Sequence, residues 1–390
     1  MAAKYGEPVR GLISEKNSIL KIVDFGDQQI FSNATTYTCL IFLSGIGHPE
    51  FSYEKVKDIN LWQIEHKDSQ PIYANSSFSK KSWVFIHGGN NALVEKVNNL
   101  STRLGNVSNF FVGLQTSADT VFLFKNTNLS NGELTEVHSK ELDKPYLIES
   151  TILKKVVRSG KIGKYWAEPT ALLLFPYNVE DKSFQLFSEE KMKSDFPNAW
   201  DYLLASKQLL AAREHGKFRN KGWYQLYPKN LSLWEQPKIL IPYMVKELSA
   251  YFDLNRYYFV NVTTGGFGLT VKNPDYSELF LTALLNSRLL NWVFVQSATQ
   301  FHGGYFGANK QYLENLPIRN IMRENLREFK IIEDIICLSK NLHESCVIKP
   351  ITPVENPLSK SVESRNLDYI DHLIYELYSL TSAEVALVEG

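Results

Sequence analysis

Residues 281–317, LTALLNSRLLNWVFVQSATQFHGGYFGANKQYLENLP, combine a helical pattern with a glycine-rich aromatic loop. The apolar residues of 281–295 recur at nearly helical spacing, which predicts a helix. The loop FHGGYFG, residues 301–307, follows, and its glycines permit backbone angles that other residues avoid. A short helix over 310–315 should end at Pro317, because proline lacks the amide donor that a helix interior needs. The stretch is predicted to be a rigid helix that carries an exposed binding loop.

The overall composition indicates a folded protein of two or three domains. A length of 390 residues with 44% hydrophobic residues is sufficient for that many cores. No apolar run of about 18 residues occurs, so we expect no membrane span. The first ten residues lack an apolar signal core. Cys39, Cys337 and Cys346 are odd in number and widely spaced, which favours reduced thiols in a cytoplasmic protein.

Charge is segregated along the chain, although the formal net charge is zero. Residues 151–165 contain five cations and no acid, and residues 207–221 contain five cations against Glu214 alone. The tail from Glu344 has eight acids against three bases. The middle of the chain is therefore basic, which suits either contact with phosphates or two solvated faces.

Three blocks in the last part of the chain resemble a known family. They are LLNSR at 284–288, FHGGY at 301–305 and KQYLENLPI at 310–318. Together they are similar to the end of a TaqI-like specificity domain. This is the target-recognition domain of adenine-N6 DNA methyltransferases and of fused type II restriction–modification enzymes. The resemblance covers roughly residues 1–320. It implies double-stranded DNA as the substrate, and as a partner a methyltransferase catalytic domain, either upstream in the same protein or separate.

The N-terminal residues suggest the end of a larger sheet. Residues 18–25 and 37–43 are nearly continuous apolar runs, as in strands buried on both faces. Two such strands alone would be unstable, so they need partner strands. They resemble the last strands of the methyltransferase catalytic domain. That resemblance implies that Phe31 stacks on a flipped-out adenine, whereas the residue by itself could be an ordinary core phenylalanine.

The catalytic and cofactor motifs of that family do not occur in this sequence. The family binds S-adenosylmethionine through a Gly-rich turn and holds the adenine with an Asn/Asp-Pro-Pro-aromatic tetrapeptide. NPDY at 273–276 is better explained as a turn before a helix. GGFG at 265–268 lacks the strand–turn–helix context of a cofactor loop. We therefore predict no catalytic residue, no metal site and no cofactor in this chain, with S-adenosylmethionine in the presumed full-length enzyme.

Polar and basic residues in the middle of the chain are candidates for DNA contact. Residues 110–126 are predicted to be hairpin-like, with Gln115, Thr116 and Ser117 at a tip that could hydrogen-bond to bases or phosphates, or be a plain turn. The basic run of 151–165, beside Tyr165 and Trp166, suits a phosphate backbone. The full predicted DNA-binding set comprises Gln115, Thr116, Ser117, Lys154, Lys155, Arg158, Lys161, Lys164, Arg213, Lys217, Arg219, Lys221, Thr264, Phe301, His302, Tyr305 and Lys310.

The fold class predicted is α+β. Strands are expected at 171–176, 233–243 and 257–262, and helices at 196–212, 322–344 and 366–378. We predict a distal fragment of a catalytic domain with its linker (1–75), a mixed target-recognition domain of short strands and several helices (76–320), and a C-terminal helical segment (321–390). Two alternatives stay open: a separate specificity subunit of a multi-subunit restriction system, and a protein-interaction module.

Overall fold

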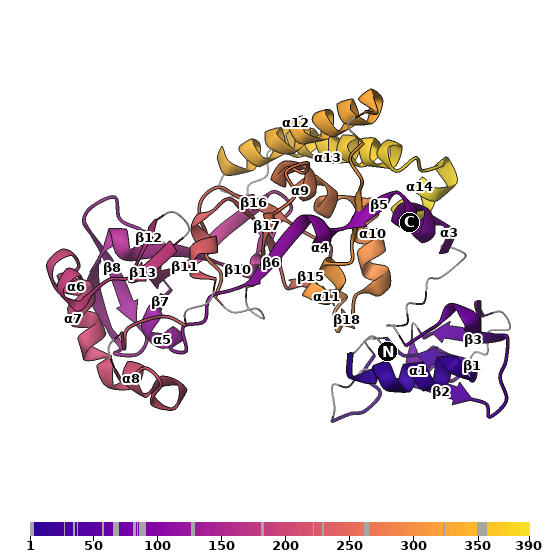
Figure 1. Ribbon diagram of the computed structural model, residues 1–390, viewed down its shortest axis with the longest axis horizontal. Helices are drawn as coiled ribbons and strands as arrows, with labels where there is room; N and C mark the ends of the chain where they lie inside the picture. The colour runs from indigo at the N-terminus through magenta and orange to yellow at the C-terminus, as the bar shows by residue number, and fades with distance from the viewer. Residues whose placement is uncertain are drawn as a thin grey trace.

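The computed structural model describes residues 4–26, 28–33, 36, 38–56, 58–64, 70–80, 83, 85, 91–125, 129–180, 183–220, 222–227, 230–260, 265–322, 324–348 and 357–390. Helices mix with several small sheets, so the α+β prediction is confirmed. An N-terminal unit, the described residues of 4–85, lies at one end of the molecule (Figure 1). The long helices α12 (Leu326–Ile348) and α13 (Pro357–Leu377) run along one side.

The N-terminal unit is a sheet of four strands in the order β2-β1-β3-β4. The strands are β1 (Ile19–Asp24), β2 (Cys39–Leu43), β3 (Glu50–Lys55) and β4 (Ile72–Ala74), preceded by helix α1 (Glu7–Glu15). Both apolar runs predicted as strands are strands, and they pair antiparallel with Ile22 opposite Ile41. One face of the sheet buries Ile22, Phe51, Tyr53 and Trp83. This core includes Trp83, beyond the predicted boundary at residue 75, which itself stays a prediction.

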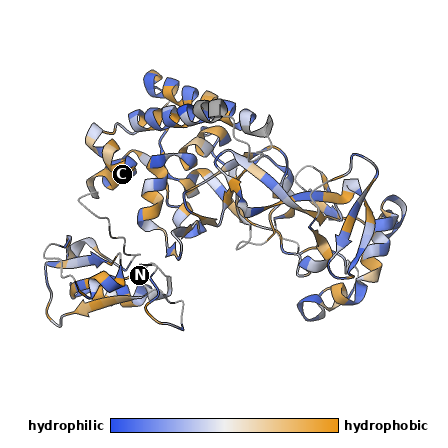
Figure 2. Ribbon diagram, turned by 180° about the vertical axis from the view of Figure 1, so that it is seen from behind, coloured by the Kyte–Doolittle hydropathy of each residue, from blue (hydrophilic) through white to orange (hydrophobic). Residues whose placement is uncertain are grey.

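Strand β2 differs from the expectation of burial on both faces. It pairs with β1 alone, and Leu40, Phe42 and Leu43 are 45%, 49% and 50% exposed. Figure 2 shows a strongly hydrophobic strand at the lower edge of the N-terminal unit. Within the described parts of the chain, no strand pairs with the second edge of β2. An apolar edge strand of this kind is a surface on which further strands can add.

The centre of the molecule is a sheet of order β16-β14-β17-β6. Its strands are β6 (Ser108–Val112), β14 (Lys238–Pro242), β16 (Tyr251–Asp253) and β17 (Gly266–Val271). All five residues of β14 are buried. A side chain at Gly268 would overlap the ring of Phe111, and one at Gly266 would overlap the carbonyl of Ile241. Gly266 and Gly268 therefore serve close strand packing, not a cofactor loop.

The predicted single helix over 281–295 is two helices, α9 (Glu278–Asn286) and α10 (Arg288–Ser297). Ser287 between them is extended. Its hydroxyl accepts from Leu290 N at 3.2 Å and donates to Leu284 O at 2.7 Å. The Asn286 amide bonds both backbone groups of Ala250, at 2.7 and 3.0 Å. Polar side chains thus cap one helix and start another within a continuous apolar pattern, because they satisfy the backbone groups that the break leaves free.

The distal lobe, the described residues of 113–235, holds a second core around β10 (Leu153–Gly163) and β11 (Trp166–Leu174). Further pairs are β8 (Leu134–Ser139) with β9 (Lys144–Glu149), and β12 (Tyr177–Glu180) with β13 (Ser183–Leu186). Three helices, α6 (Glu189–Asp195), α7 (Pro197–Ala205) and α8 (Lys207–Gly216), cover it. The helix predicted over 196–212 is interrupted at Ser206.

The hairpin predicted over 110–126 is wrong. Strand β6 pairs with β17, whereas β7 (Leu123–Phe124) pairs with β11 in a different sheet. A short helix, α5 (Asp119–Phe122), separates the two. Phe124 is fully buried in the distal core, so pairing with β11 buries apolar surface that a hairpin would leave outside. The strand predicted over 257–262 makes only isolated bridges in its described part, at Tyr258 and Val260.

The helices predicted over 322–344 and 366–378 are confirmed as parts of α12 and α13. Helix α12 packs on α9, where Ser339 donates to Leu279 O at 2.9 Å, and α13 packs on α12 and α10. A last helix, α14 (Ser382–Glu389), follows. Acids of this tail pair with cations elsewhere, for example Glu384 with Lys96 at 2.6 Å, so folding partly neutralises the segregated charge. In the described chain, no helix has both the length and the apolarity needed to cross a membrane.

Candidate nucleic-acid interface

Two segments that are far apart in the sequence lie against each other and are called here the loop pair. They are residues 115–117 and residues 213–219, which begin within the printed bounds of α8 where Arg213, Glu214 and His215 have non-helical backbone angles. The Arg213 guanidinium donates to Thr116 O at 2.5 Å. The Ser117 hydroxyl donates to the Glu214 carboxylate at 2.7 Å. The amide of Tyr227 donates to Gln115 O at 2.9 Å. Two of the four clusters predicted to contact DNA therefore lie beside each other in the fold.

Arg213 lies beneath that surface and not on it. Besides Thr116 O, its guanidinium donates to Leu210 O at 2.9 Å, to Trp223 O at 2.9 Å and to Gln225 O at 2.8 Å. Four of its five N–H donors are thus used inside the protein. Burial lowers the pKa of Arg213 to about 10. The prediction that Arg213 contacts DNA directly is therefore corrected, because its charged group is buried and already bonded.

Thr116 is corrected for the same reason. Its side chain is buried, and its hydroxyl donates to the Asp119 carboxylate and accepts from Ala118 N at 3.1 Å. These bonds shape the turn that begins α5. Thr116 holds the loop in place, whereas its neighbours Gln115 and Ser117 are exposed.

The exposed part of the loop pair carries cations and an unusual backbone. Lys217 and Arg219 are exposed, and the Lys217 ammonium lies 4.9 Å from the centre of the Tyr227 ring. Ser117, Glu214 and His215 have left-handed φ values of 52°, 49° and 57°. Such backbone is costly for residues other than glycine and is concentrated at functional sites. Sequence reasoning missed His215, because nothing in its neighbours signals this conformation. Lys221 lies outside the described residues.

Most of the basic run on β10 and in the turn that follows it is ion-paired. Lys154 bonds Glu235 at 3.0 Å, Lys161 bonds Glu168 at 2.7 Å, and Lys164 bonds Glu247 at 2.9 Å. Lys155 and Arg158 are exposed and have no ion-pair partner in the part of the chain that the structure describes. The sequence shows the run without acids, because its partners come from other segments. Only part of the run therefore offers free charge to a phosphate.

The glycine-rich loop is a small hairpin of β18 (Gln300–Phe301) and β19 (Tyr305–Gly307), which pairs with β15 (Met244–Val245). His302 is exposed at the tip, where Gly303 and Gly304 have left-handed φ values of 80° and 75°. Tyr305 is 39% exposed, and the Lys246 ammonium lies 5.4 Å from its ring centre. Lys246 was missed by sequence reasoning, because it lies about 60 residues away.

The remaining residues of this region complete the hairpin's surroundings. Phe301 is half-buried, and a side chain at Gly307 would approach its ring to 2.9 Å. Lys310, at the start of α11 (Lys310–Leu313), is exposed and only 4.0 Å from Glu314. Thr264 lies outside the described residues. The predicted exposed aromatic loop is thus reduced to Tyr305 and the His302 tip, with Phe301 as its support.

Phe31 lies on the N-terminal unit in the segment that follows β1. Its side chain is 54% exposed, so it is not an ordinary core phenylalanine. The Lys55 ammonium at the end of β3 donates to the Gln300 amide oxygen at 3.3 Å, which joins the N-terminal unit to the hairpin. In Figure 1, helix α8, the hairpin strand β18 and the N-terminal unit lie on the lower side, opposite α12 and α13.

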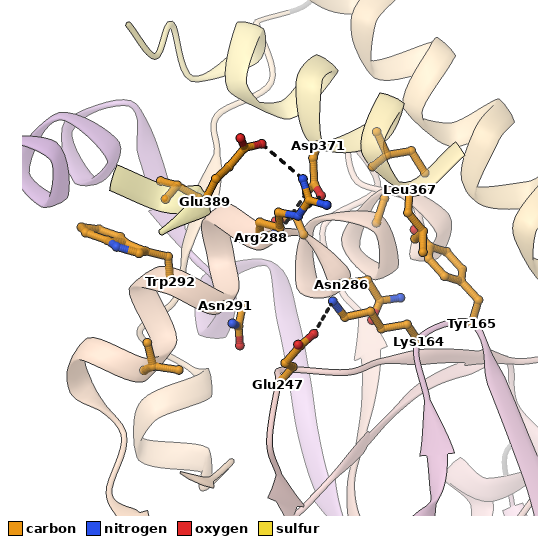
Figure 3. Close-up of a pocket in the computed structure, with 15 residues that line it drawn as sticks. Lys164, Tyr165, Glu247, Asn286, Arg288, Asn291, Trp292, Leu367, Asp371 and Glu389 are labelled. Atoms are coloured by element: carbon orange, nitrogen blue, oxygen red, sulfur yellow. Dashed lines mark hydrogen bonds and ion pairs between the residues drawn. The ribbon is translucent and has the colours of Figure 1, made fainter. Parts of the chain in front are cut away.

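A cavity of about 420 Å³ lies between the β10–β11 turn and helices α9, α10, α13 and α14 (Figure 3). Its charges are paired with one another. Lys164 bonds Glu247, and Arg288 bonds Asp371 at 3.5 Å and Glu389 at 3.2 Å. Burial raises the pKa of Asp371. The cavity is therefore a joint in which Arg288, from the LLNSR block, holds the tail helices.

Two segments of the described chain that look like cofactor motifs have structural roles. No group of three or more potential metal ligands occurs in the described ranges. At Gly266 and Gly268 the space for a side chain is filled by Ile241 and Phe111. In the NPDY block, Asn273 accepts from Asp275 N at 3.0 Å and Ser277 caps α9, so this block is a turn and helix start as predicted.

Comparisons with known proteins give the family relation. Residues 190–318 match the family model of the TaqI-like C-terminal specificity domain. The type II restriction enzyme and methyltransferase RM.Eco57I of Escherichia coli is 25% identical over an alignment of 413 residues, which covers 98% of this chain and 40% of that protein. The type II methyltransferase M.BanIII of Aneurinibacillus aneurinilyticus is 20% identical over 370 residues, covering 82% of this chain and 59% of that protein. The chain spans about half the length of these curated relatives.

A solved structure supports the fold alone. The type IIL restriction–modification enzyme MmeI, determined in complex with DNA, aligns with 95% of this chain and 45% of its own, with a TM-score of 0.51 and 11% identity. The predicted resemblance is thus confirmed. The chain carries the match to the TaqI-like C-terminal specificity domain at residues 190–318 and is similar over most of its length to type II restriction–modification methyltransferases.

Proposed function

We propose that this chain is the DNA-recognising portion of an adenine-N6 DNA methyltransferase or of a fused restriction–modification enzyme. Its role is to read double-stranded DNA and to hold the target for a methyltransferase catalytic domain encoded upstream. The observation that carries the proposal is the loop pair, whose Lys217 and Arg219 lie inside the matched domain. Exposed cations beside hydrogen-bonding side chains are what a duplex-reading surface requires.

The exposed residues divide into two roles. Lys155, Arg158, Lys217, Arg219 and Lys310 contact phosphates, because they are exposed cations. Groups that can both donate and accept hydrogen bonds read base edges, and these are Gln115, Ser117 and His302, with Tyr305 as a stacking face. The ion-paired Lys154, Lys161 and Lys164 contribute less, because a phosphate must compete with a carboxylate for each. Lys221 and Thr264 stay in the predicted set.

The exposed strand β2 favours the proposal that a catalytic domain packs beside this chain. Its open edge and its exposed Leu40 and Phe42 suit strands of a methyltransferase sheet, where they would become buried. Phe31, exposed on the same unit, would then stack on the flipped-out adenine. S-adenosylmethionine belongs to that partner in the complete enzyme, because the family's Gly-rich turn and Asn/Asp-Pro-Pro-aromatic tetrapeptide do not occur in this sequence.

The salt dependence of duplex binding tests this proposal. Each phosphate neutralised contributes about −0.9 to the slope of log K against log salt, so five phosphate contacts give a slope of about −4 to −5. Replacing Lys217 by Met should reduce the slope by about one. Lys340→Met is the matched control, because this exposed lysine belongs to α12, a helix on the opposite side of the molecule in Figure 1, and its slope should equal that of the wild type. A flat salt dependence for the wild type contradicts the proposal.

A separate specificity subunit is the second candidate, because the exposed edge of β2 suits a catalytic domain on another polypeptide equally well. The two candidates differ in covalent connection alone, which the reading frame upstream decides. A protein-interaction module is the third. Replacing Tyr305 by Ala distinguishes this module from the DNA-reading candidates. Loss of binding to a partner protein with unchanged duplex binding would favour the module.

A further inference from the structure

We infer that Arg213 is a positioning residue, which joins the two loops of the loop pair into one base-reading surface without touching DNA itself. The inference rests on the proposed function and deepens it, because it separates sequence discrimination from affinity for the backbone. It concerns a residue whose type and neighbours suggested a phosphate contact.

The hydrogen bonds of Arg213 connect three segments. Its guanidinium donates to Thr116 O in the first loop, and to Trp223 O and Gln225 O beyond the second. The Phe122 and Phe218 rings lie over it, with centres 5.3 and 4.6 Å from the guanidinium carbon. A planar fork can hold several carbonyls in fixed directions, whereas a lysine ammonium is a flexible point charge. The arrangement therefore depends on the shape of the guanidinium and not on its charge alone.

The residues next to these bonds have a costly backbone. Glu214 and His215 follow Arg213 directly, and Ser117 follows Thr116, whose carbonyl Arg213 holds. All three have left-handed φ values. Residues other than glycine keep this conformation only where their surroundings impose it. Arg213 and the Ser117–Glu214 hydrogen bond are the contacts that impose it here. The directions of Ser117, Glu214 and His215 toward a ligand thus depend on Arg213.

Base reading and phosphate binding respond differently to a loosened loop. A base-edge hydrogen bond needs its donor and acceptor placed within about 0.5 Å. A phosphate contact tolerates larger shifts, because it is mainly an electrostatic attraction that falls slowly with distance. Release of the loop pair should therefore reduce discrimination between sequences more than it reduces binding as such.

The experiment compares two duplexes with the full chain. A preferred duplex is first selected from a randomised library by the wild type, and a shuffled duplex of equal composition serves as the reference. The discrimination ratio is the dissociation constant of the shuffled duplex divided by that of the preferred duplex. It is measured for the wild type, Arg213→Met, Arg213→Lys and the exposed-cation control Arg219→Met. Glu214→Asn is a second route, because it removes a surface hydrogen bond, leaves the core intact and allows a left-handed backbone.

We expect both Arg213 variants to lower the ratio at least about tenfold, the size of one good base contact. Glu214→Asn should lower the ratio less. Arg219→Met should lower the affinity for both duplexes by the same factor. A variant that is merely destabilised has fewer folded molecules. This lowers the apparent affinity for both duplexes by the same factor and leaves the discrimination ratio unchanged. An unchanged ratio in either Arg213→Met or Glu214→Asn, or full rescue by Arg213→Lys, overturns the inference. Absence of duplex binding by the wild type instead refutes the proposed function, and the inference with it.

Discussion

Replacing Lys238 by Met should destabilise the centre of the molecule strongly. The Lys238 ammonium and the Asp253 carboxylate are 2.6 Å apart, and both side chains are fully buried where β14 meets β16. Removing one partner of a buried pair costs about 3–5 kcal/mol, because the other charge is left uncompensated. Asp253 also accepts from Asn255 N at 2.9 Å and Tyr257 N at 2.8 Å, which lessens the cost. We therefore expect a loss of about 3 kcal/mol in the free energy of unfolding.

The loss should depend on pH. Burial raises the pKa of Asp253, and Lys238 opposes that rise. Without Lys238, the folded-state pKa of Asp253 rises further above its unfolded value. A group with a raised folded pKa favours folding at pH values below its unfolded pKa, and that stability is lost as pH rises through the folded pKa. The defect of the variant should therefore be smaller at about pH 5 than at about pH 8.

Urea unfolding of the full chain measures both effects. The Trp234 indole lies beside the pair, since the Lys238 ammonium is 5.6 Å from the centre of its ring, so tryptophan fluorescence reports on this region. The control is again Lys340→Met, which removes an exposed ion pair and should change stability by less than about 1 kcal/mol. A loss below about 1 kcal/mol for Lys238→Met, or a defect that does not depend on pH, would refute the reasoning.

Three further predictions concern other parts of the chain. Ser287→Ala removes the cap between α9 and α10 and should lower the unfolding free energy by about 1 kcal/mol in urea titrations, whereas Ser287→Asp should keep most of it. Gly268→Ala should cost about 1–3 kcal/mol, because the new methyl group overlaps the Phe111 ring; a neutral result in thermal unfolding would contradict this packing. Burial lowers the pKa of His343 on α12, so this residue contributes stability above its unfolded pKa and loses it as pH falls through that range. The difference in urea midpoint between about pH 7.5 and about pH 5.5 should therefore shrink in His343→Leu, and an equal difference would count against a neutral buried imidazole.

The elements that could be predicted from sequence are those whose pattern is local. The apolar runs 18–25 and 37–43 are strands, and the periodic segment 322–344 is a helix, because each pattern by itself buries apolar surface. The break at Ser287 could not be predicted from apolar spacing alone. It depends on Asn286 bonding Ala250, a contact with a segment 36 residues away.

The candidate site was predictable in composition but not in detail. Arg213 and Lys217 are alike in sequence, both cations in one basic cluster, yet one is buried and the other exposed. Which is which depends on the carbonyls of Thr116, Trp223 and Gln225, which meet only in the folded chain. In the same way, three cations of the run 151–165 find carboxylates from other segments. Long-range partners therefore decide which of the candidate residues are free to bind.

The Arg288 joint has a consequence for exchanging recognition specificities between enzymes. The cluster that contains Leu284 and Leu285 of α9 also contains Ile335 of α12, Ile374 of α13 and Val388 of α14. A graft that carried the matched residues 190–318 alone would lack the tail helices of this shared core. The apolar residues of α9 that pack on those helices would then be exposed to water. A transplanted domain that keeps its folded structure would therefore have to include the three tail helices.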